Sequence, residues 1–247
     1  MSLAIDGPVA HVTIDNPSAR NAMSPGMMAD LVQIITTLEG AEVSVVLLHG
    51  EGDKAFCAGG DLRSVAAHLM APEHAKGMCA VMTDALNRLA SLHAVVLAAV
   101  EGAALGGGAE ILSAVDGVVA ARGATVGFIH GRLGVSPGWG GGGRLVRRVG
   151  AARALQVMTL ARRMSAEEAH GLGVVDRLVP DGEALAEAER WAAQVCAQPM
   201  AAVRGAVRVV RAWRDVPAGA ADVEASVFSE LWGGPAHVAA LAQVLRK

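Results

Sequence analysis

AAVEGAALGGGAE (residues 98–110) is the stretch that decides the fold, and KAFCAGGD (residues 54–61) is its counterpart earlier in the chain. In both, an apolar run breaks into small residues and glycines just ahead of an expected helix. A glycine-rich turn leaves backbone N–H groups uncovered and lets another molecule approach the main chain. Two such turns, brought together by the fold, can aim two N–H groups at one carbonyl oxygen, as in an oxyanion hole. Glu110 follows in the first turn of the second helix, where a carboxylate is placed to handle a proton.

Outward from these turns, strand patterns alternate with helix patterns. The expected strands are Val9 to Ile14, Val43 to Leu48, Ala94 to Val100 and Gly117 to Ala120. The expected helices are Pro25 to Leu38, Glu73 to Leu92 and one from about Gly107, with a loop from Glu51 to Gly60. This alternation predicts an α/β core with parallel strands and right-handed crossovers.

The chain from Pro137 onward is expected to be almost entirely helical. The candidate helices are Ala151 to Leu160, Ala166 to Gly171, Glu183 to Ala197, Ala201 to Trp213 and Val223 to Leu245, with a short strand at Val174 to Leu178. A composition shift near Pro180 predicts a core at residues 1–180 and a C-terminal helical region at residues 181–247. Homo-oligomerisation is expected because this tail carries large apolar residues that need a partner surface. They are Val227, Phe228, Leu231 and Trp232.

The amino-acid composition limits the classes of function that this protein can have. The 247 residues are 53% hydrophobic, which is ample for a large core, and the net charge of −3 argues against nucleic-acid or polybasic membrane binding. Three scattered cysteines form no disulfide framework, and no signal peptide or membrane span is apparent, so we expect a reducing, cytoplasmic setting. The eight histidines form no HExxH or other tight cluster, so no metal site is expected. Because the chain has no tyrosine, mechanisms that need its hydroxyl are excluded.

Six blocks, in this order and spacing, resemble the crotonase (enoyl-CoA hydratase/isomerase) superfamily. The blocks are NPSARNAMS (16–24), KAFCAGGDL (54–62), EGAALGGGAEI (101–111), VGFIHGRLGVSPGWGGGGRL (126–145), ARRMSAEEAHGLGVVDRLV (161–179) and the helical tail. The resemblance implies a spiral of β-β-α repeats, with a C-terminal helical region that helps form trimers. It also implies an acyl-CoA substrate, with coenzyme A as part of the substrate and no separate cofactor. The shared chemical step is a thioester enolate held by two backbone N–H groups.

Carried over residue by residue, the resemblance assigns the two oxyanion-hole N–H groups to Gly60 and Gly107. The positions implied for substrate and CoA binding are Arg20, Ala58, Asp61 and Arg63. Among these, Ala58 aligns with a backbone contact to the adenine end of CoA. The two arginines align with positions that meet CoA phosphates in some family members, and the planar guanidinium binds phosphate well.

One departure from the family pattern concerns the catalytic acids. Family hydratases position water with two glutamates; Glu110 aligns with the first, whereas His130 stands where the second would fall. A histidine can donate, accept or carry charge near neutral pH, but it cannot simply replace a carboxylate in a pair that shares a water. Ordinary hydration is therefore disfavoured. His130 followed by PxWGG, together with the tail residues 231–236 (LWGGPA), resembles the ethylmalonyl-CoA decarboxylase-like subgroup.

Decarboxylation suits these residues because a malonyl-type thioester that loses carbon dioxide leaves the enolate that two N–H groups would stabilise. His130 would orient the leaving carboxylate or deliver the proton, Glu110 would do the other task, and Trp139 would form part of the pocket wall. Two alternatives stay open: hydration or isomerisation of an enoyl-CoA in fatty-acid or related metabolism, and a catalytically idle fold that binds CoA esters.

Three further features receive structural interpretations. Residues 138–143 (GWGGGG) satisfy GxGxxG, but Ser136-Pro137 precedes them instead of a buried strand, so we expect the glycines to let a helix pack tightly near the acyl pocket. Cys57 is expected to be a buried small hydrophobe and not a nucleophile. A basic cluster is hypothesised to meet acidic neighbours across a subunit interface. It comprises Arg144, Arg147, Arg148, Arg153, Arg162 and Arg163.

Overall fold

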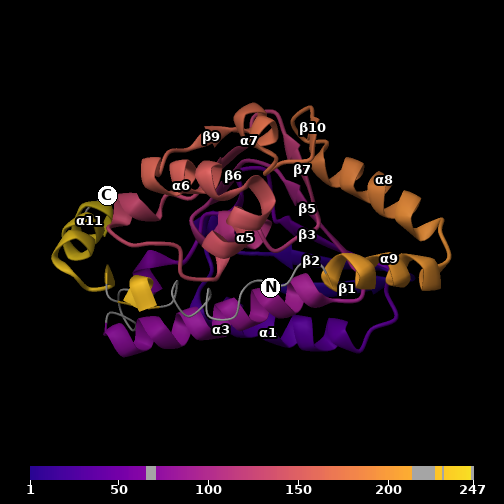
Figure 1. The fold of residues 1–247 in the computed structure, drawn as a ribbon, viewed down its shortest axis with the longest axis horizontal. Coiled ribbons are helices and arrows are strands. Elements are labelled where there is room, and N and C mark those ends of the chain that lie inside the picture. Colours follow the sequence, from indigo (N-terminus) through magenta and orange to yellow (C-terminus); the bar gives the residue numbers. More distant parts are fainter. Residues whose placement is uncertain (65–70, 213–225, 230, 246–247) are drawn as a thin grey trace.

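A large sheet runs through the molecule in the computed structural model, which describes residues 1–64, 71–212, 226–229 and 231–245 (Figure 1). Its strand order is β1-β2-β3-β5-β7-β10. The strands are β1 (Ser2–Asp6), β2 (Val9–Ile14), β3 (Val45–Gly50), β5 (Val95–Val100), β7 (Gly117–Ala121) and β10 (Arg177–Val179). β1 is antiparallel to β2, and the others pair in parallel, which confirms the predicted parallel core.

A second, smaller sheet has the strand order β4-β6-β8-β9. Its strands are β4 (Ala55–Cys57), β6 (Ala103–Leu105), β8 (Thr125–Gly127) and β9 (Met164–Ser165). Consecutive strands alternate between the two sheets, as β3 then β4, β5 then β6, and β7 then β8. Helices α3 (Pro72–Ser91) and α4 (Gly107–Leu112) follow the first two of these pairs. The chain therefore repeats a β-β-α unit.

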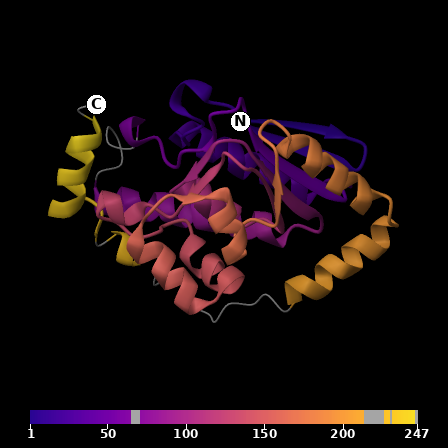
Figure 2. The ribbon, with the colours of Figure 1, turned by 90° about the horizontal axis from the view of Figure 1, so that it is seen from above.

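The remaining helices surround the sheets. They are α1 (Pro25–Glu39), α5 (Gly141–Val149), α6 (Ala151–Leu160), α7 (Ala166–Leu172), α8 (Ala184–Cys196), α9 (Met200–Ala212) and α11 (Pro235–Leu245), with 3-10 turns η1 (Pro17–Ala19) and η2 (His130–Leu133). Local signals set several ends: Ser24 caps α1 by accepting a hydrogen bond from the Met27 N–H, and Pro25 suits its first turn. Figures 1 and 2 place α11 at one end of the molecule and the α8–α9 pair at the other.

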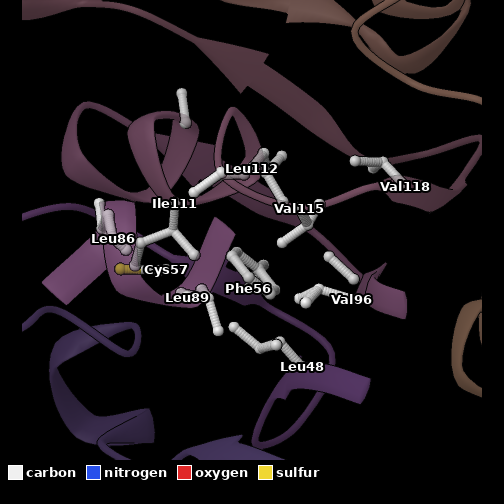
Figure 3. Close-up of a cluster of buried hydrophobic side chains, with 14 of the residues drawn as sticks. Leu48, Phe56, Cys57, Leu86, Leu89, Val96, Ile111, Leu112, Val115 and Val118 are labelled. Carbon is white, nitrogen blue, oxygen red and sulfur yellow. The ribbon is translucent and has the colours of Figure 1, made fainter. Parts of the chain in front are cut away.

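The central strands β3, β5 and β7 of the large sheet are buried on both faces, whereas β1 at its edge is mostly exposed. Successive side chains of a strand point to opposite sides, so each central strand contributes to two layers of core. One face joins α1, α3 and α4 in the main core, drawn in Figure 3 with the labelled residues Leu48, Phe56, Cys57, Leu86, Leu89, Val96, Ile111, Leu112, Val115 and Val118. On the other face, α8 packs against Leu47, Leu97 and Val119. α8 contributes alanines at four-residue spacing (Ala184, Ala188 and Ala192), so it can lie close to the sheet.

Most expected elements are confirmed, but the sequence interpretation missed β1 and all the strands of the smaller sheet. The expected loop from Glu51 to Gly60 contains β4. Strands of two or three residues are too short for a period-two pattern to stand out. The division of the chain near Pro180 stays a prediction; the structure packs α8, which follows it, on the large sheet.

The prediction of a single continuous helix from Val223 to Leu245 is wrong. Residues 223–225 lie outside the described residues, residues 226–229 are helical, and α11 begins only at Pro235. Gly233 has a φ of 74°, which interrupts the helix, and proline then starts the next one.

The tail residues expected to need a partner surface divide into two kinds. Phe228 and Trp232 are 5% and 6% exposed and pack within the chain against Ala75, Cys79 and Val135, so for these two the expectation is corrected. Only Val227 and Leu231 stay exposed, at 39% and 42%. Across the described ranges, we find no helix with the length and apolar character needed to cross a membrane.

Candidate active site

The two glycine turns recognised in the sequence lie against each other. β4 and β6 pair in parallel, so the turns that follow them emerge at the same edge of the small sheet. A Cβ placed on Gly59 would lie 3.2 Å from the Gly107 nitrogen, and one on Gly108 would lie 2.1 Å from the Cys57 carbonyl oxygen. Gly59 also has a φ of 100°. Backbone packs directly on backbone here, and only glycine fits.

The N–H groups of Gly60 and Gly107 have no hydrogen-bond partner among the described residues. Gly107 is the first residue of α4, where a helix leaves its N–H groups without an internal acceptor. The neighbouring N–H of Asp61 is used, because it donates to the Met23 carbonyl over 2.9 Å. The two predicted oxyanion-hole donors are thus unoccupied; their role stays a prediction.

Glu110 lies beneath these turns, 1% exposed, in the first turn of α4. Its Oε1 accepts hydrogen bonds from His130 Nε2 at 2.9 Å and from the Gly138 N–H at 3.3 Å. Its Oε2 accepts from the N–H groups of Trp139 at 2.8 Å and Gly141 at 2.9 Å. We call Glu110, His130, Gly138, Trp139 and Gly141 the acyl network. Because a carboxylate offers about four acceptor positions, this one is fully engaged.

Electrostatics keep the Glu110 carboxylate ionised. Burial raises the pKa of Glu110, but the charge and hydrogen bond of His130 and the N–H groups of Trp139 and Gly141 outweigh it, and the pKa lies below its usual range. An ionised carboxylate has no proton to donate, so the hydrogen between the two side chains belongs to His130 Nε2.

His130 begins η2 and is 7% exposed. Its second ring nitrogen, Nδ1, is buried and makes no hydrogen bond. A buried polar atom without a partner is uncommon and costs free energy unless something binds it. The structure therefore brings the two predicted catalytic side chains together and leaves one nitrogen of the pair available.

The glycine run after Pro137 lets the helix start approach Glu110. A Cβ on Gly141 would lie 2.4 Å from Glu110 Cγ, and one on Gly138 would lie 2.6 Å from the Phe228 ring. The interpretation of these glycines as packing residues is confirmed. α5 starts at Gly141 and its first turn faces the carboxylate, so the run is not a dinucleotide fingerprint.

Trp139 is 4% exposed, and its ring occupies the space in which a Gly107 Cβ would sit, 2.2 Å from the nearest ring atom. The buried guanidinium of Arg144 donates to the Trp139 carbonyl and to Asn87 Oδ1, the latter at 2.9 Å. The hypothesis that this arginine reaches across a subunit interface is therefore wrong: it holds the Trp139 backbone within its own chain. Within the same basic cluster, Arg148 pairs with Asp176 of this chain.

The predicted CoA-binding residues lie in two adjoining segments, one after η1 and one after β4, and we call them the CoA-end residues (Arg20, Ala58, Asp61 and Arg63). The Ala58 N–H donates to the Arg20 carbonyl at 3.1 Å. Asp61 caps the following helical turn, accepting from the Arg63 N–H at 3.1 Å and from Ser64 Oγ at 2.6 Å. Both guanidinium groups are exposed and make no ion pair with the described residues. Their contacts with CoA stay predictions.

Asn21 is a positioning residue that the sequence interpretation missed. It is 1% exposed with a φ of 57°, a left-handed conformation that asparagine tolerates. Its Nδ2 donates to the carbonyls of Ala55 at 2.7 Å and Glu51 at 3.0 Å, and its Oδ1 accepts from the Asn16 N–H at 2.9 Å. These bonds fasten the segment that carries Arg20 to β4. In the sequence, the only feature that could have indicated this role is an asparagine in an expected turn.

Neither a thiol nucleophile nor a metal ion is indicated here. Burial raises the pKa of the Cys57 thiol to about 12, so the thiolate is disfavoured, in agreement with its interpretation as a small hydrophobe. In the parts of the chain that the structure describes, no group of three or more His, Cys, Asp or Glu residues is arranged to hold a metal.

The amino-acid sequence and the overall fold are similar to those of known proteins. Residues 4–232 match the family model described as enoyl-CoA hydratase/isomerase. An ethylmalonyl-CoA decarboxylase from Danio rerio is 38% identical over 241 residues, which cover 95% of this chain and 79% of that protein. One from Xenopus laevis is 35% identical over 246 residues, covering 98% and 82%. An enoyl-CoA hydratase structure from Bacillus anthracis superimposes with a TM-score of 0.82 at 29% identity, covering 100% of this chain and 91% of that one. The spiral of β-β-α repeats with a helical C-terminal region is confirmed.

Proposed function

The chain belongs to the enoyl-CoA hydratase/isomerase family, and from that premise we propose that it decarboxylates a malonyl-type acyl-CoA thioester. The observation that carries this proposal is His130, buried beside Glu110 with Nδ1 unpaired, at the position where a hydratase would need a second carboxylate. The relatives named ethylmalonyl-CoA decarboxylase support it, because they match over nearly the whole chain.

The reaction proceeds through an enolate. The bond between Cα and the free carboxylate breaks, carbon dioxide leaves, and the electron pair moves onto the thioester, whose oxygen becomes negative. The N–H groups of Gly60 and Gly107 stabilise that oxygen, and losing one such donor costs about 2.7–4 kcal/mol in acyl-transfer enzymes. A proton then adds to Cα and gives the shorter acyl-CoA.

Hydration of an enoyl-CoA is less well supported by the same residues. It requires a water held by groups with free acceptor positions, whereas both oxygens of Glu110 already accept two hydrogen bonds each from the protein. Decarboxylation needs no base to begin. It needs stabilisation of the enolate and one proton donor, and the unpaired N–H groups of the glycine turns and His130 support an assignment of both to this site.

The experiment compares ethylmalonyl-CoA, methylmalonyl-CoA and crotonyl-CoA side by side by mass spectrometry. We expect loss of carbon dioxide from the first two and no substantial addition of water to the third. The variant His93→Ala, which alters an exposed histidine away from the site, is the matched control and should behave as the wild type. Rapid hydration of crotonyl-CoA without decarboxylation would overturn the proposal. An idle, CoA-ester-binding fold would show no turnover of any of the three.

We further propose that the protein is a homotrimer or a dimer of trimers, and that it acts in the cytoplasm in fatty-acid or related acyl-CoA metabolism. The exposed Val227 and Leu231 support assembly, and three free cysteines suit a reducing compartment. The proposed reaction uses no cofactor beyond the CoA of the substrate and no nucleic-acid or membrane partner. Light scattering at micromolar concentration tests the assembly, and a monomer would refute it.

A further inference from the structure

We propose that Glu110 is a positioning residue that takes no part in proton transfer, and that His130 Nδ1–H is the group that protonates the enolate. This inference rests on the proposed decarboxylation and assigns the roles within it. It departs from the sequence expectation, in which both side chains act directly on the substrate.

The first argument is the number of acceptor positions on Glu110. Its two oxygens receive four hydrogen bonds, three of them from backbone N–H groups at the start of α5 and in the loop before it. Backbone donors fixed by the fold cannot turn away when substrate binds. To receive or release a proton, the carboxylate would first have to give up one of these bonds while buried, which is costly.

The second argument is that one ring nitrogen of His130 has no hydrogen-bond partner. His130 Nε2 is taken by Glu110 at 2.9 Å, whereas Nδ1 is buried with no partner. When both ring nitrogens carry hydrogen, Nε2–H is donated to Glu110, whereas Nδ1–H has no acceptor among the described residues. The ring is therefore held at one nitrogen and offers a proton at the other. Of the two side chains, only His130 keeps an unused polar atom.

The third argument concerns timing. A hydrogen bond from Nδ1 to the departing carboxylate would stabilise the substrate more than the transition state, because negative charge leaves that carboxylate as the bond breaks. A proton delivered to Cα after carbon dioxide leaves carries no such penalty. The step balances: the N–H bond breaks, a C–H bond forms and the enolate charge is neutralised. Neutral His130 then takes up one proton from solvent, which is the proton that the overall decarboxylation consumes, while Glu110 stays ionised.

A double-mutant cycle tests the assignment. The wild type, Glu110→Gln, His130→Ala and the double variant are compared for kcat and KM on ethylmalonyl-CoA. We expect His130→Ala to lower kcat about 10²- to 10⁴-fold. Glu110→Gln should lower it by at least about tenfold, as loss of an orienting carboxylate does elsewhere. In the His130→Ala background the glutamine should change kcat by less than about twofold, because its effect passes through the histidine. KM should change little throughout.

Equal losses from Glu110→Gln in both backgrounds would overturn the proposal, since they would mean that Glu110 acts independently of the histidine. Glu189→Gln, at an exposed position on α8, controls for the loss of a carboxylate. Thermal unfolding of each variant separates loss of fold from loss of rate.

A second measurement does not depend on any variant retaining activity. Nitrogen-15 NMR of histidine-labelled wild type, with His130→Ala used for assignment, reports which ring nitrogen bears hydrogen. We expect Nε2 to be protonated. A ring with a bare Nε2 would require a protonated Glu110 and would overturn the proposal. If the wild type decarboxylates nothing, the proposed function fails, while the NMR result still decides how Glu110 and His130 share their proton.

Discussion

In the acyl network almost every polar atom is held by the protein, whereas in the CoA-end residues the charged groups reach solvent. Glu110 and His130 are 1% and 7% exposed and are fixed by backbone N–H groups. Arg20 and Arg63 are exposed, and only their backbones are tied down. On the proposed function, this contrast predicts a division of roles. The fixed buried groups would set the rate of the chemical step, and the exposed charges would set how well the flexible, anionic CoA part of the substrate is held.

The largest effect should come from filling the space between the two glycine turns. In Gly107→Ala, the new Cβ would lie 2.2 Å from the Trp139 ring, so the ring and the glycine turn proposed as the oxyanion hole must move apart. We expect kcat to fall at least about 10²-fold, as when one oxyanion donor is lost, with overpacking costing about 1–3 kcal/mol in unfolding free energy.

Gly205→Ala is the matched control, because no atom lies within 4 Å of its Cβ position in α9. It should keep full activity and gain about 0.5–1 kcal/mol from helix propensity. Steady-state kinetics and urea unfolding measure both variants. Normal kinetics in Gly107→Ala would show that the Trp139 contact with this turn does not shape the site.

The second effect tests whether the acyl network depends on the C-terminal segment. Phe228 is 5% exposed, and its ring fills the space beside Gly138, whose N–H donates to Glu110. Phe228→Ala should lower the stability by about 3–5 kcal/mol, as for other buried aromatic residues, and should also lower kcat. Val209→Ala, altering a residue on α9 that is 63% exposed, is the control. Thermal unfolding and kcat are measured together, and an unchanged kcat in folded Phe228→Ala would separate the segment from the site.

A smaller effect is expected from pH. The pKa of Glu110 is lower in the folded protein than the ordinary value of 4.5. The carboxylate therefore stabilises the fold fully above pH 4.5, and this contribution is lost as pH falls through the folded pKa. Thermal unfolding of the wild type and Glu110→Gln between pH 7 and 3 should show a Tm gap that narrows with acid. A gap independent of pH would contradict the assigned charge, and Glu189→Gln should show no gap.

The smallest effect should come from the CoA end. Arg20→Ala and Arg63→Ala should each raise KM for the acyl-CoA by about two- to fivefold with little change in kcat, since exposed charge pairs contribute about 0–1 kcal/mol. The rise should shrink at high salt because screening already weakens these contacts. Arg153→Ala, which removes an exposed arginine elsewhere, is the control. A fall in kcat at unchanged KM would place these arginines with the chemistry and remove the contrast between the two ends.

Much of the fold could be read from the sequence, because long strands and helices repeat a pattern. β2 and α6 begin and end where expected, β5 begins one residue later than expected, and α3 begins and ends one residue earlier. The strands of the small sheet could not be found, since three residues such as Ala55–Cys57 show no period. They matter nonetheless, because β4 and β6 place the two glycine turns side by side.

The candidate site could be read only in part. Glu110 and His130 were both predicted to be catalytic, and the structure places them in contact at 2.9 Å, while their roles stay a prediction. The backbone donors that saturate Glu110 come from residues 28 to 31 positions further along the chain, so no local pattern shows them. The same holds for Arg144, whose partners Asn87 and Trp139 lie on other segments. Sequence identifies the chemical groups, whereas the folded chain decides which of their atoms are free.

The most direct test of the account is the ratio of decarboxylation of ethylmalonyl-CoA to hydration of crotonyl-CoA, measured in the wild type and in His130→Glu. We predict that the wild type strongly favours decarboxylation, and that the variant loses it by at least about 10²-fold because its proton donor is gone. A folded His130→Glu variant that gains hydration and keeps decarboxylation at the wild-type rate would contradict the role given to His130.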